Sequence, residues 1–357
     1  MMAGMTEVIE VNPEHPDPAA IARAAARLRA GGLVAFPTET VYGLGVNALD
    51  AAAVRRLFQA KGRPSTDPLI VHITSLQALT VLVSERPAIV DSLAARFWPG
   101  PLTLVLPRSP AVPMEVTASL DTIAVRMPAH PVAHALITAA GIPVAAPSAN
   151  LFSRPSPTRA AHVLEDLHGR IDIVVDAGET TVGVESTVLD VTGEQPMILR
   201  LGAVTPEMLR EVLGTVGVRH THEPPPTGPL PSPGLLERHY SPRAPLTLYE
   251  GPDALRSLFR DATAAVAAGQ RVGLMLARGD LDGATFSVEP HARQNVTVRE
   301  LGPELSDVAR TLYGALRDLD NASVDAILAR AFSTADGLGL AIADRMRRAA
   351  AGRVVHT

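Results

Sequence analysis

The chain has 357 residues, of which 46% are hydrophobic and 19% charged, so it is a globular protein long enough for two domains. It has no cysteine, which excludes disulfides, thiolate catalysis and cysteine-ligated metals, and its net charge of −5 argues against a surface that coats nucleic acid. No stretch reaches the roughly 18 consecutive apolar residues of a membrane helix, and the start of the chain lacks a signal-peptide pattern. We therefore expect a cytoplasmic protein with no membrane contact.

In the first part of the chain, short apolar runs alternate with helical patterns. Asp17 is placed to cap a helix that ends at Ala30, and Asp50 to cap one that ends at Lys61-Gly62. Further helices are predicted over Ala88–Phe97, Pro131–Ala140, Arg159–Leu167 and Pro206–Leu213. Strands are predicted over Leu33–Phe36, Leu69–Ile73, Leu102–Leu106, Ile123–Met127, Pro143–Ala146, Ile171–Val175, Thr187–Val191 and Met197–Leu201. The irregular alternation indicates an α/β domain with a mixed, twisted sheet over residues 1–220.

A proline-rich segment follows this domain. Residues 223–245 contain eight prolines, which favour an extended connection, so residues 221–245 are predicted to be a linker. Beyond it, strands are predicted over Leu246–Tyr249, Val272–Leu276, Asn295–Arg299 and Val324–Ala329, and helices over Ala254–Ala268, Leu305–Leu319 and Leu340–Ala350. This regular alternation predicts a small Rossmann-like domain over residues 246–357, with a parallel sheet and helices on both faces.

The densest group of polar residues, PTETVYGLG, follows the first predicted strand. This group places two hydroxyls, a carboxylate, a phenol and two glycines at the carboxyl end of that strand, where α/β sheets usually bind ligands. The polar side chains are those of Thr38, Glu39, Thr40 and Tyr42. The alternative is a turn in which the threonine side chains bond their own backbone.

Lys61 is the only lysine among 32 basic residues, which suggests a role that arginine does not fill. Arg63 stands two residues later in a proline-bounded loop, and two neighbouring cations suit a polyphosphate ligand. The alternative for both is a favourable interaction with the carboxyl end of the preceding helix.

Two arginines interrupt apolar strands. Arg126 and Arg200 must each be paired or face a cleft, because an isolated buried charge is very costly. His72 ends a predicted strand, where a histidine satisfied within the core is the default. Ser148 and Asn150 follow another strand and Ser186 precedes one, so each places small polar groups at a strand end. There is no GxxxxGK[ST] loop, so any use of ATP is without the common phosphate-binding motif.

Taken in order, these segments resemble the signatures of the YrdC/TsaC-type threonylcarbamoyl-adenylate synthases in their long, two-domain form. The matching segments are PTETVYGLG, KGRPSTDPLIVHI, RFWPGPLTLVL, VRMP, APSAN, ESTVLD, ILRLGAVT and SPGLLERHYSPRAP. The resemblance implies a YrdC-like domain that condenses L-threonine, bicarbonate and ATP, with Mg²⁺, into threonylcarbamoyl-AMP and pyrophosphate. A separate tRNA threonylcarbamoyl transferase complex would then use the product, and a direct contact with tRNA or double-stranded RNA is an added possibility.

The resemblance also implies roles for individual residues. Lys61 and Arg63 would be catalytic cations, and the protein ligands of the metal are unknown. ATP would be bound by Lys61, Arg63, Asp67, Thr122, Ser148, Asn150, Arg200 and Tyr240. Threonine would be bound by Thr38, Thr40, Tyr42, His72, Arg126 and Ser186. The family commonly has asparagine where this chain has Asp67 and proline where it has Leu201, and a carboxylate near phosphates is unhelpful unless it meets Mg²⁺ or faces away.

Tyr240 lies in the linker within Arg238-His239-Tyr240-Ser241-Pro242, a segment rich in rings and charges. We expect this segment to close over the nucleotide as a semi-rigid flap. The alternative is that Tyr240 packs on the second domain.

Two other functions compete with this interpretation. A non-catalytic module that binds double-stranded RNA would use arginine-rich segments on phosphates, and its binding would fall steeply with added salt. A factor that handles carbamoyl phosphate, as in hydrogenase maturation, usually carries cysteine-rich zinc modules, and this chain has no cysteine.

Overall fold

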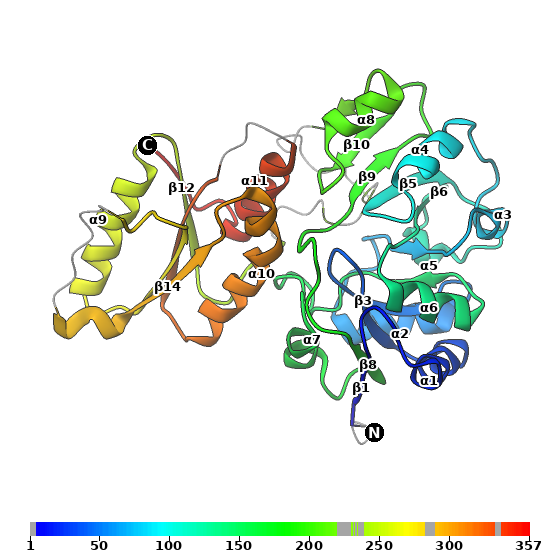
Figure 1. The fold of residues 1–357 in the computed structure, drawn as a ribbon, viewed down its shortest axis with the longest axis horizontal. Coiled ribbons are helices and arrows are strands. Elements are labelled where there is room, and N and C mark those ends of the chain that lie inside the picture. The colour runs from blue at the N-terminus through cyan, green and yellow to red at the C-terminus, as the bar shows by residue number, and fades with distance from the viewer. Residues whose placement is uncertain are drawn as a thin grey trace. The chain divides into compact units, whose positions relative to one another are not determined.

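The computed structural model describes residues 5–219, 230, 232, 234, 239–282, 290–332 and 337–357. The chain divides into two compact units: Met1–Phe152 with Ser156–Leu235, and Ser153–Pro155 with Leu236–Thr357. Both combine helices with a sheet, which confirms the predicted α/β class (Figure 1). In these ranges no helix is long and apolar enough to cross a membrane.

The first unit is built on a mixed sheet. Its described strands are β1 (Glu7–Glu10), β2 (Val34–Pro37), β3 (Tyr42–Asn47), β4 (Ile70–His72), β5 (Leu102–Pro107), β6 (Thr122–Arg126), β7 (Val144–Ala145), β8 (Ile173–Asp176), β9 (Thr187–Asp190), β10 (Met197–Arg200) and β11 (Gly217–Val218). They lie in the order β1-β8-β2-β3-β7-β4-β6-β5-β9-β10-β11. Parallel pairs such as β4 with β6 alternate with antiparallel pairs such as β5 with β6, so the predicted mixed sheet is confirmed.

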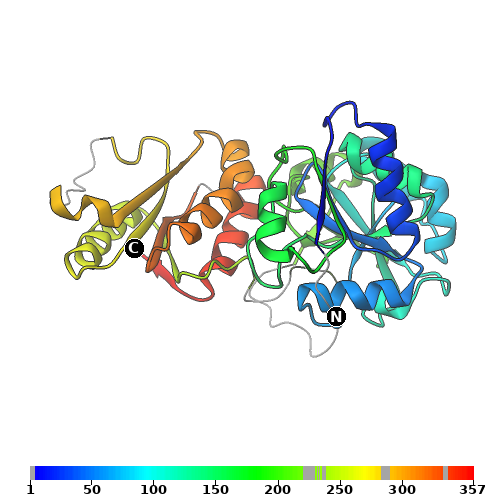
Figure 2. The same cartoon turned by 90° about the horizontal axis from the view of Figure 1, so that it is seen from below.

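Helices cover this sheet on both faces. They are α1 (Pro18–Arg29), α2 (Ala51–Lys61), α3 (Leu79–Leu82), α4 (Ile89–Phe97), α5 (Met114–Thr117), α6 (Pro131–Ala140), α7 (Ala160–Leu167) and α8 (Pro206–Leu213), with a 3-10 turn η1 (Leu76–Ala78). As predicted, Asp17 and Asp50 cap α1 and α2 through their carboxylates. In Figure 2 the dark blue α1 and the lighter blue α2 lie on opposite sides of the sheet, and they contribute to separate cores.

One face of the sheet is only partly covered by helices. Helices α1 and α6 pack on the side chains of β1, β8, β2 and β7, where they form one apolar core. On the strands β4, β6, β5 and β9, the side chains of the same face form a separate small cluster of Ile70, Ala124, Val105 and Val188. Because successive side chains of a strand point to opposite faces, Leu104 and Val125 pack instead in the large core on the other side.

Three strands of this unit, β1, β3 and the two-residue β11, were not predicted. Strand β1 carries glutamates at both ends and pairs with β8, so its sequence lacks the apolar run of a central strand. Strand β3 contains Gly43 and Gly45, which weaken any strand pattern. A Cβ atom at Gly45 would lie 2.8 Å from atoms of both Phe36 and Val144, so this glycine allows close packing within the sheet.

The second unit has a parallel sheet, as predicted. Its strands are β12 (Leu246–Glu250), β13 (Val272–Ala277), β14 (Val296–Leu301), β15 (Ala326–Arg330) and β16 (Val354–His356), in the order β14-β13-β15-β12-β16. Its helices are α9 (Ala254–Ala267), α10 (Leu305–Asn321) and α11 (Gly337–Ala350), with a 3-10 turn η2 (Pro290–Asn295). Figure 1 shows α9 on one side of this sheet and α10 and α11 on the other.

Candidate functional site

The candidate site lies on the part of the first sheet that α1 and α6 leave uncovered. Strand register places Arg126 beside His72 on β4 and beside Thr103 on β5. Thr122 and Arg126 share their face of β6 with Ala124, because alternate residues of a strand point the same way. The result is an apolar floor, formed by the small cluster around Ala124, with polar side chains around it.

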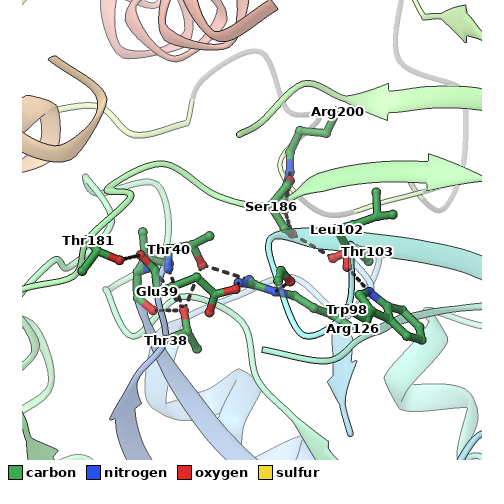
Figure 3. Close-up of polar contacts among 12 residues, drawn as sticks. Thr38, Glu39, Thr40, Trp98, Leu102, Thr103, Arg126, Thr181, Ser186 and Arg200 are labelled. Atoms are coloured by element: carbon green, nitrogen blue, oxygen red, sulfur yellow. Dashed lines mark hydrogen bonds and ion pairs between the residues drawn. The ribbon is translucent and has the colours of Figure 1, made fainter. Parts of the chain in front are cut away.

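Arg126 is the centre of one group of contacts, which we call the Arg126 cluster (Glu39, Thr40, Gly100 and Arg126). Its guanidinium donates to the Thr40 hydroxyl at 2.9 Å and to the Gly100 carbonyl at 3.2 Å, and it forms an ion pair with Glu39 at 2.6 Å (Figure 3). Trp98 donates its indole N–H to the Leu102 carbonyl, which ties down the two ends of the loop that carries Gly100. The buried charge therefore has the partner that the sequence requires.

The Thr38–Thr40 turn bonds its own backbone and also contacts Arg126. The Thr38 hydroxyl donates to the Val41 carbonyl at 2.6 Å, as in a self-satisfied turn. The Thr40 hydroxyl lies 2.9 Å from that of Thr38 and accepts from Arg126. Val182 donates its backbone N–H to the Glu39 carbonyl, which fixes the turn from outside. Thr38 thus orders the turn, and the hydroxyl of Thr40 is the group of the turn that accepts a hydrogen bond from Arg126.

The side chain of Ser186 forms hydrogen bonds with residues of two strands, β5 and β10. Its hydroxyl lies 2.8 Å from that of Thr103 on β5 and accepts from Arg200 at 3.1 Å. Arg200 also donates to the Ser186 carbonyl through two nitrogens, at 3.0 and 3.1 Å. The guanidinium is buried and points towards Ser186, the residue just before β9 (Figure 3).

Lys61 is also buried, at 1% exposure. It is the last residue of α2, and Gly62 follows in the left-handed conformation, with φ of 64°, that lets the chain turn away. The Lys61 ammonium donates to the Ser148 carbonyl at 2.6 Å and to the Asn150 carbonyl. The two segments that the sequence predicts to bind ATP are therefore in direct contact.

Asp67 lies among three cations, and together they form the Asp67 cluster (Lys61, Arg63, Asp67 and Arg200). Its carboxylate is fully buried and lies 2.9 Å from the guanidinium of Arg63. Burial raises the pKa of Asp67, while the charges of Arg63, Arg200 and Lys61 oppose that rise. Arg200 contacts Ser186 as well, so it links this cluster to the strands around Arg126.

His72 is a neutral imidazole in this setting. Burial and, to a smaller extent, the nearby charge of Arg126 together lower its pKa to about 3. Its ring meets Phe36 edge-on at 6.4 Å, and its Nδ1 has no hydrogen-bond partner among the described residues. His72 can therefore offer a hydrogen bond to a ligand without adding a second positive charge beside Arg126.

Tyr42 is placed differently from the threonine contact expected of it. Its ring is fully buried in the core, and its hydroxyl donates to the Gly178 carbonyl at 2.7 Å and accepts from the Ala177 N–H. Burial raises the pKa of the phenol. The Tyr42 hydroxyl connects β3 to the residues just after β8, so we interpret Tyr42 as a structural residue beside the site.

This interpretation predicts the behaviour of Tyr42→Phe. Loss of the hydroxyl removes a buried hydrogen bond, so the free energy of unfolding should fall by about 1–2 kcal/mol. The affinity for threonine should stay within a factor of two or so of the native value. Urea unfolding and threonine titration measure the two effects, and a large loss of threonine affinity in a stable variant would restore the ligand contact.

Thr122 and Tyr240 lie outside the contacts described so far. Thr122 begins β6, in line with the residues just before β4 and so beside the loop of Arg63 and Asp67. The buried Tyr240 ring packs 5.3 Å from that of Tyr313 within the second unit. That is the packing alternative for Tyr240, and its contact with ATP stays a prediction.

Of the proposed flap, Arg238 lies outside the described residues, as do most of the linker residues before it. Of the described linker positions, Leu230 donates its backbone N–H to the Thr66 carbonyl at 3.2 Å and is buried. This part of the linker therefore contacts the loop between Lys61 and Asp67.

Sequence reasoning included Glu39 only in the polar group after the first strand, without a role of its own, and it missed Thr103. Glu39 stands within PTETVYGLG, and the need of Arg126 for a buried anion was the signal that could have identified it. Thr103 was hidden in a predicted apolar strand, where a single hydroxyl is unremarkable. Its role depends on the pairing of β5 with β9, which the sequence alone does not specify.

Two family models match the chain. Residues 26–202 match the model described as Telomere recombination, whose label combines Sua5, YciO and YrdC. Residues 204–351 match the Threonylcarbamoyl-AMP synthase, C-terminal domain.

Curated relatives are similar over nearly the full length. A threonylcarbamoyl-AMP synthase of Pyrococcus abyssi is 44% identical over 98% of this chain and 99% of the relative. One of Bacillus subtilis is 45% identical over 94% of each chain, and one of Schizosaccharomyces pombe is 37% identical over 89% of this chain and 84% of the relative.

Two solved structures are also similar to this chain. The P. abyssi Sua5 structure complexed with L-threonine has a TM-score of 0.91 and 43% identity, and covers 99% of this chain and 100% of its own. A P. abyssi Sua5 variant with a histidine and a tyrosine replaced by alanine has a TM-score of 0.89 and 43% identity, over 99% and 98% of the two chains.

Proposed function

The chain belongs to the threonylcarbamoyl-AMP synthase family, and from this premise we propose how its own residues bind the substrates and support the reaction. Threonine binds at the Arg126 cluster and ATP at the Asp67 cluster. The observation that carries the proposal is the placement of Arg200, which hydrogen bonds Ser186 beside Thr103 and acts on Asp67 through its charge. The two clusters are therefore parts of one site.

At the Arg126 cluster, the guanidinium pairs with the carboxylate of threonine. The hydroxyls of Thr40 and Ser186 and the neutral imidazole of His72 give hydrogen-bonding groups for the rest of the amino acid. All of these groups are buried, so a ligand that replaces water there gains stronger electrostatic contacts. Thr38 acts by ordering the turn that carries Thr40.

At the Asp67 cluster, Lys61, Arg63 and Arg200 bind the phosphates of ATP, and Ser148, Asn150 and Thr122 border them. The neutral amine of threonine forms a C–N bond with the carbon of bicarbonate, and a C–O bond of bicarbonate breaks as water leaves. An oxygen of the resulting carbamate attacks the α-phosphorus, and the bond to pyrophosphate breaks. The substrates supply the nucleophile, so the cations act by positioning the triphosphate and stabilising charge on the departing group.

Mg²⁺ enters this proposal as the metal carried by ATP. In the described part of the chain no three acidic or histidine side chains gather to hold a metal, and the Asp67 carboxylate is paired with Arg63. These described residues therefore do not form a metal site of their own. The phosphate oxygens of ATP are the hard ligands that Mg²⁺ prefers.

A ligand-omission assay tests the proposed function. Pyrophosphate release from ATP should require threonine and bicarbonate together, because the carbamate is the attacking group. Pyrophosphate is measured with each component left out in turn, and the adenylate product is identified by mass spectrometry. Equal release without threonine or without bicarbonate would contradict the proposal.

A further inference from the structure

The carboxylate of Asp67 occupies an unusual position, because it lies inside the cluster of cations proposed to bind phosphates. One of its oxygens is 2.9 Å from the Arg63 guanidinium, and none of the side chain is exposed to solvent. The backbone of the same loop accepts from Arg63 as well, at the carbonyls of Asp67 (3.2 Å) and Pro68 (2.9 Å). The loop therefore wraps the guanidinium and places a negative charge against it.

Two further cations, from other parts of the fold, are near enough for their charges to act on this carboxylate. Lys61 comes from the end of α2 and Arg200 from β10, and both act on Asp67 through their charges. Three buried cations without an anion would repel one another, so the carboxylate compensates them when no nucleotide is bound. A polyphosphate would supply the same compensation with more charge.

Asp67 and a bound phosphate carry charges of the same sign and share the same cations. Two anions at one site disfavour each other, as when carboxylates share a proton. We propose that Asp67 is an internal counter-anion of the phosphate site, which competes with the phosphates of ATP and of pyrophosphate for Arg63 and so weakens the binding of both. This inference rests on the proposed ATP site and adds to it the residue that sets its affinity.

Competition of this kind has a use in the proposed reaction. Pyrophosphate leaves with several negative charges, and three buried cations would retain it strongly. When Asp67 re-forms its ion pair with Arg63, the cations are again compensated and the product is released. The same competition lowers the affinity for ATP, and contacts with the nucleoside must offset this loss.

The test is direct titration of Asp67→Asn with ATP and, separately, with pyrophosphate, each in the absence of threonine. Asparagine keeps the shape of the side chain and removes its charge. We expect both ligands to bind about tenfold more tightly than to the native chain, since one like charge is removed at close range. Inhibition of turnover by pyrophosphate should become stronger by a similar factor, while the affinity for threonine should not change.

Asp172→Asn is the matched control. Asp172 is also a carboxylate paired with arginine, but its partners are Arg27 and Arg56, and it precedes β8. Its neutralisation should leave ATP and pyrophosphate affinity unchanged. An equal gain in both variants would mean that the effect comes from net charge alone and would overturn the proposal.

Other outcomes of these titrations would contradict either this proposal or the proposed function. Unchanged or weaker ATP binding by a folded Asp67→Asn variant would show that the carboxylate positions Arg63 and does not compete. If that variant does not fold, Asp67→Ser takes its place, and failure of both to fold would make the carboxylate a structural requirement and overturn the proposal. If the native chain and the folded variants all fail to bind ATP, the proposed function is contradicted instead.

Discussion

Replacing Arg126 by alanine is expected to raise the KM for threonine by about 100-fold, because a buried, charge-assisted contact with a carboxylate contributes roughly 1.5–3 kcal/mol. The same change should lower the free energy of unfolding by about 3–5 kcal/mol, since it leaves the Glu39 carboxylate buried without its ion-pair partner. Steady-state kinetics at saturating ATP and chemical unfolding measure the two effects separately.

A second variant separates binding from stability. In the pair Arg126→Ala with Glu39→Gln, no uncompensated charge is left, so most of the lost stability should return. The KM for threonine should remain high, because the cation is still absent. If the double variant also recovers threonine affinity, Arg126 stabilises the fold around Glu39 and is not the threonine contact.

The sequence was sufficient to predict the strand that carries Arg126 and the need of this arginine for a partner. The run Ile123–Met127 reads as a strand with one charge, and strand alternation then sets Arg126 opposite the core-facing Val125. What it could not predict was the partner of that charge. Glu39 and Arg126 are far apart in the chain, and they meet because the turn after β2 lies over the end of β6.

Strand β3, which was not predicted, also depends on residues that are far from it in the sequence. Its two glycines remove the local preference for a strand, yet β2 and β7 on either side supply the hydrogen bonds. Tertiary pairing therefore overrides a weak local pattern. This pairing also explains Tyr42, whose phenol was expected at the ligand but is directed by strand register towards the end of β8.

The surroundings of the Asp67 carboxylate also could not be predicted from the sequence. The sequence analysis recognised that a carboxylate near phosphates is unhelpful unless it meets Mg²⁺ or faces away. The structure shows a third arrangement, an ion pair with Arg63 among further cations. Loop geometry decides which of these occurs, and the proline-bounded sequence around Asp67 does not specify it.

Lys61→Ala is expected to lower turnover by at least about tenfold, as expected for a cation that positions phosphates. The buried ammonium bonds the carbonyls of Ser148 and Asn150, so its loss should also lower the free energy of unfolding, by about 1–3 kcal/mol. Pyrophosphate release at saturating substrates and thermal unfolding measure the two effects.

Lys61→Met distinguishes the charge from the packing of the stem. Methionine fills most of the volume of the buried side chain, so a defect common to both variants belongs to the ammonium. Arg55→Met is the control on the same helix, since Arg55 pairs with Glu115 and is largely exposed, and its turnover should be native. If both Lys61 variants fold and turn over normally, the single lysine is a helix-end charge, and the ATP contacts must be sought at Arg63 and Arg200.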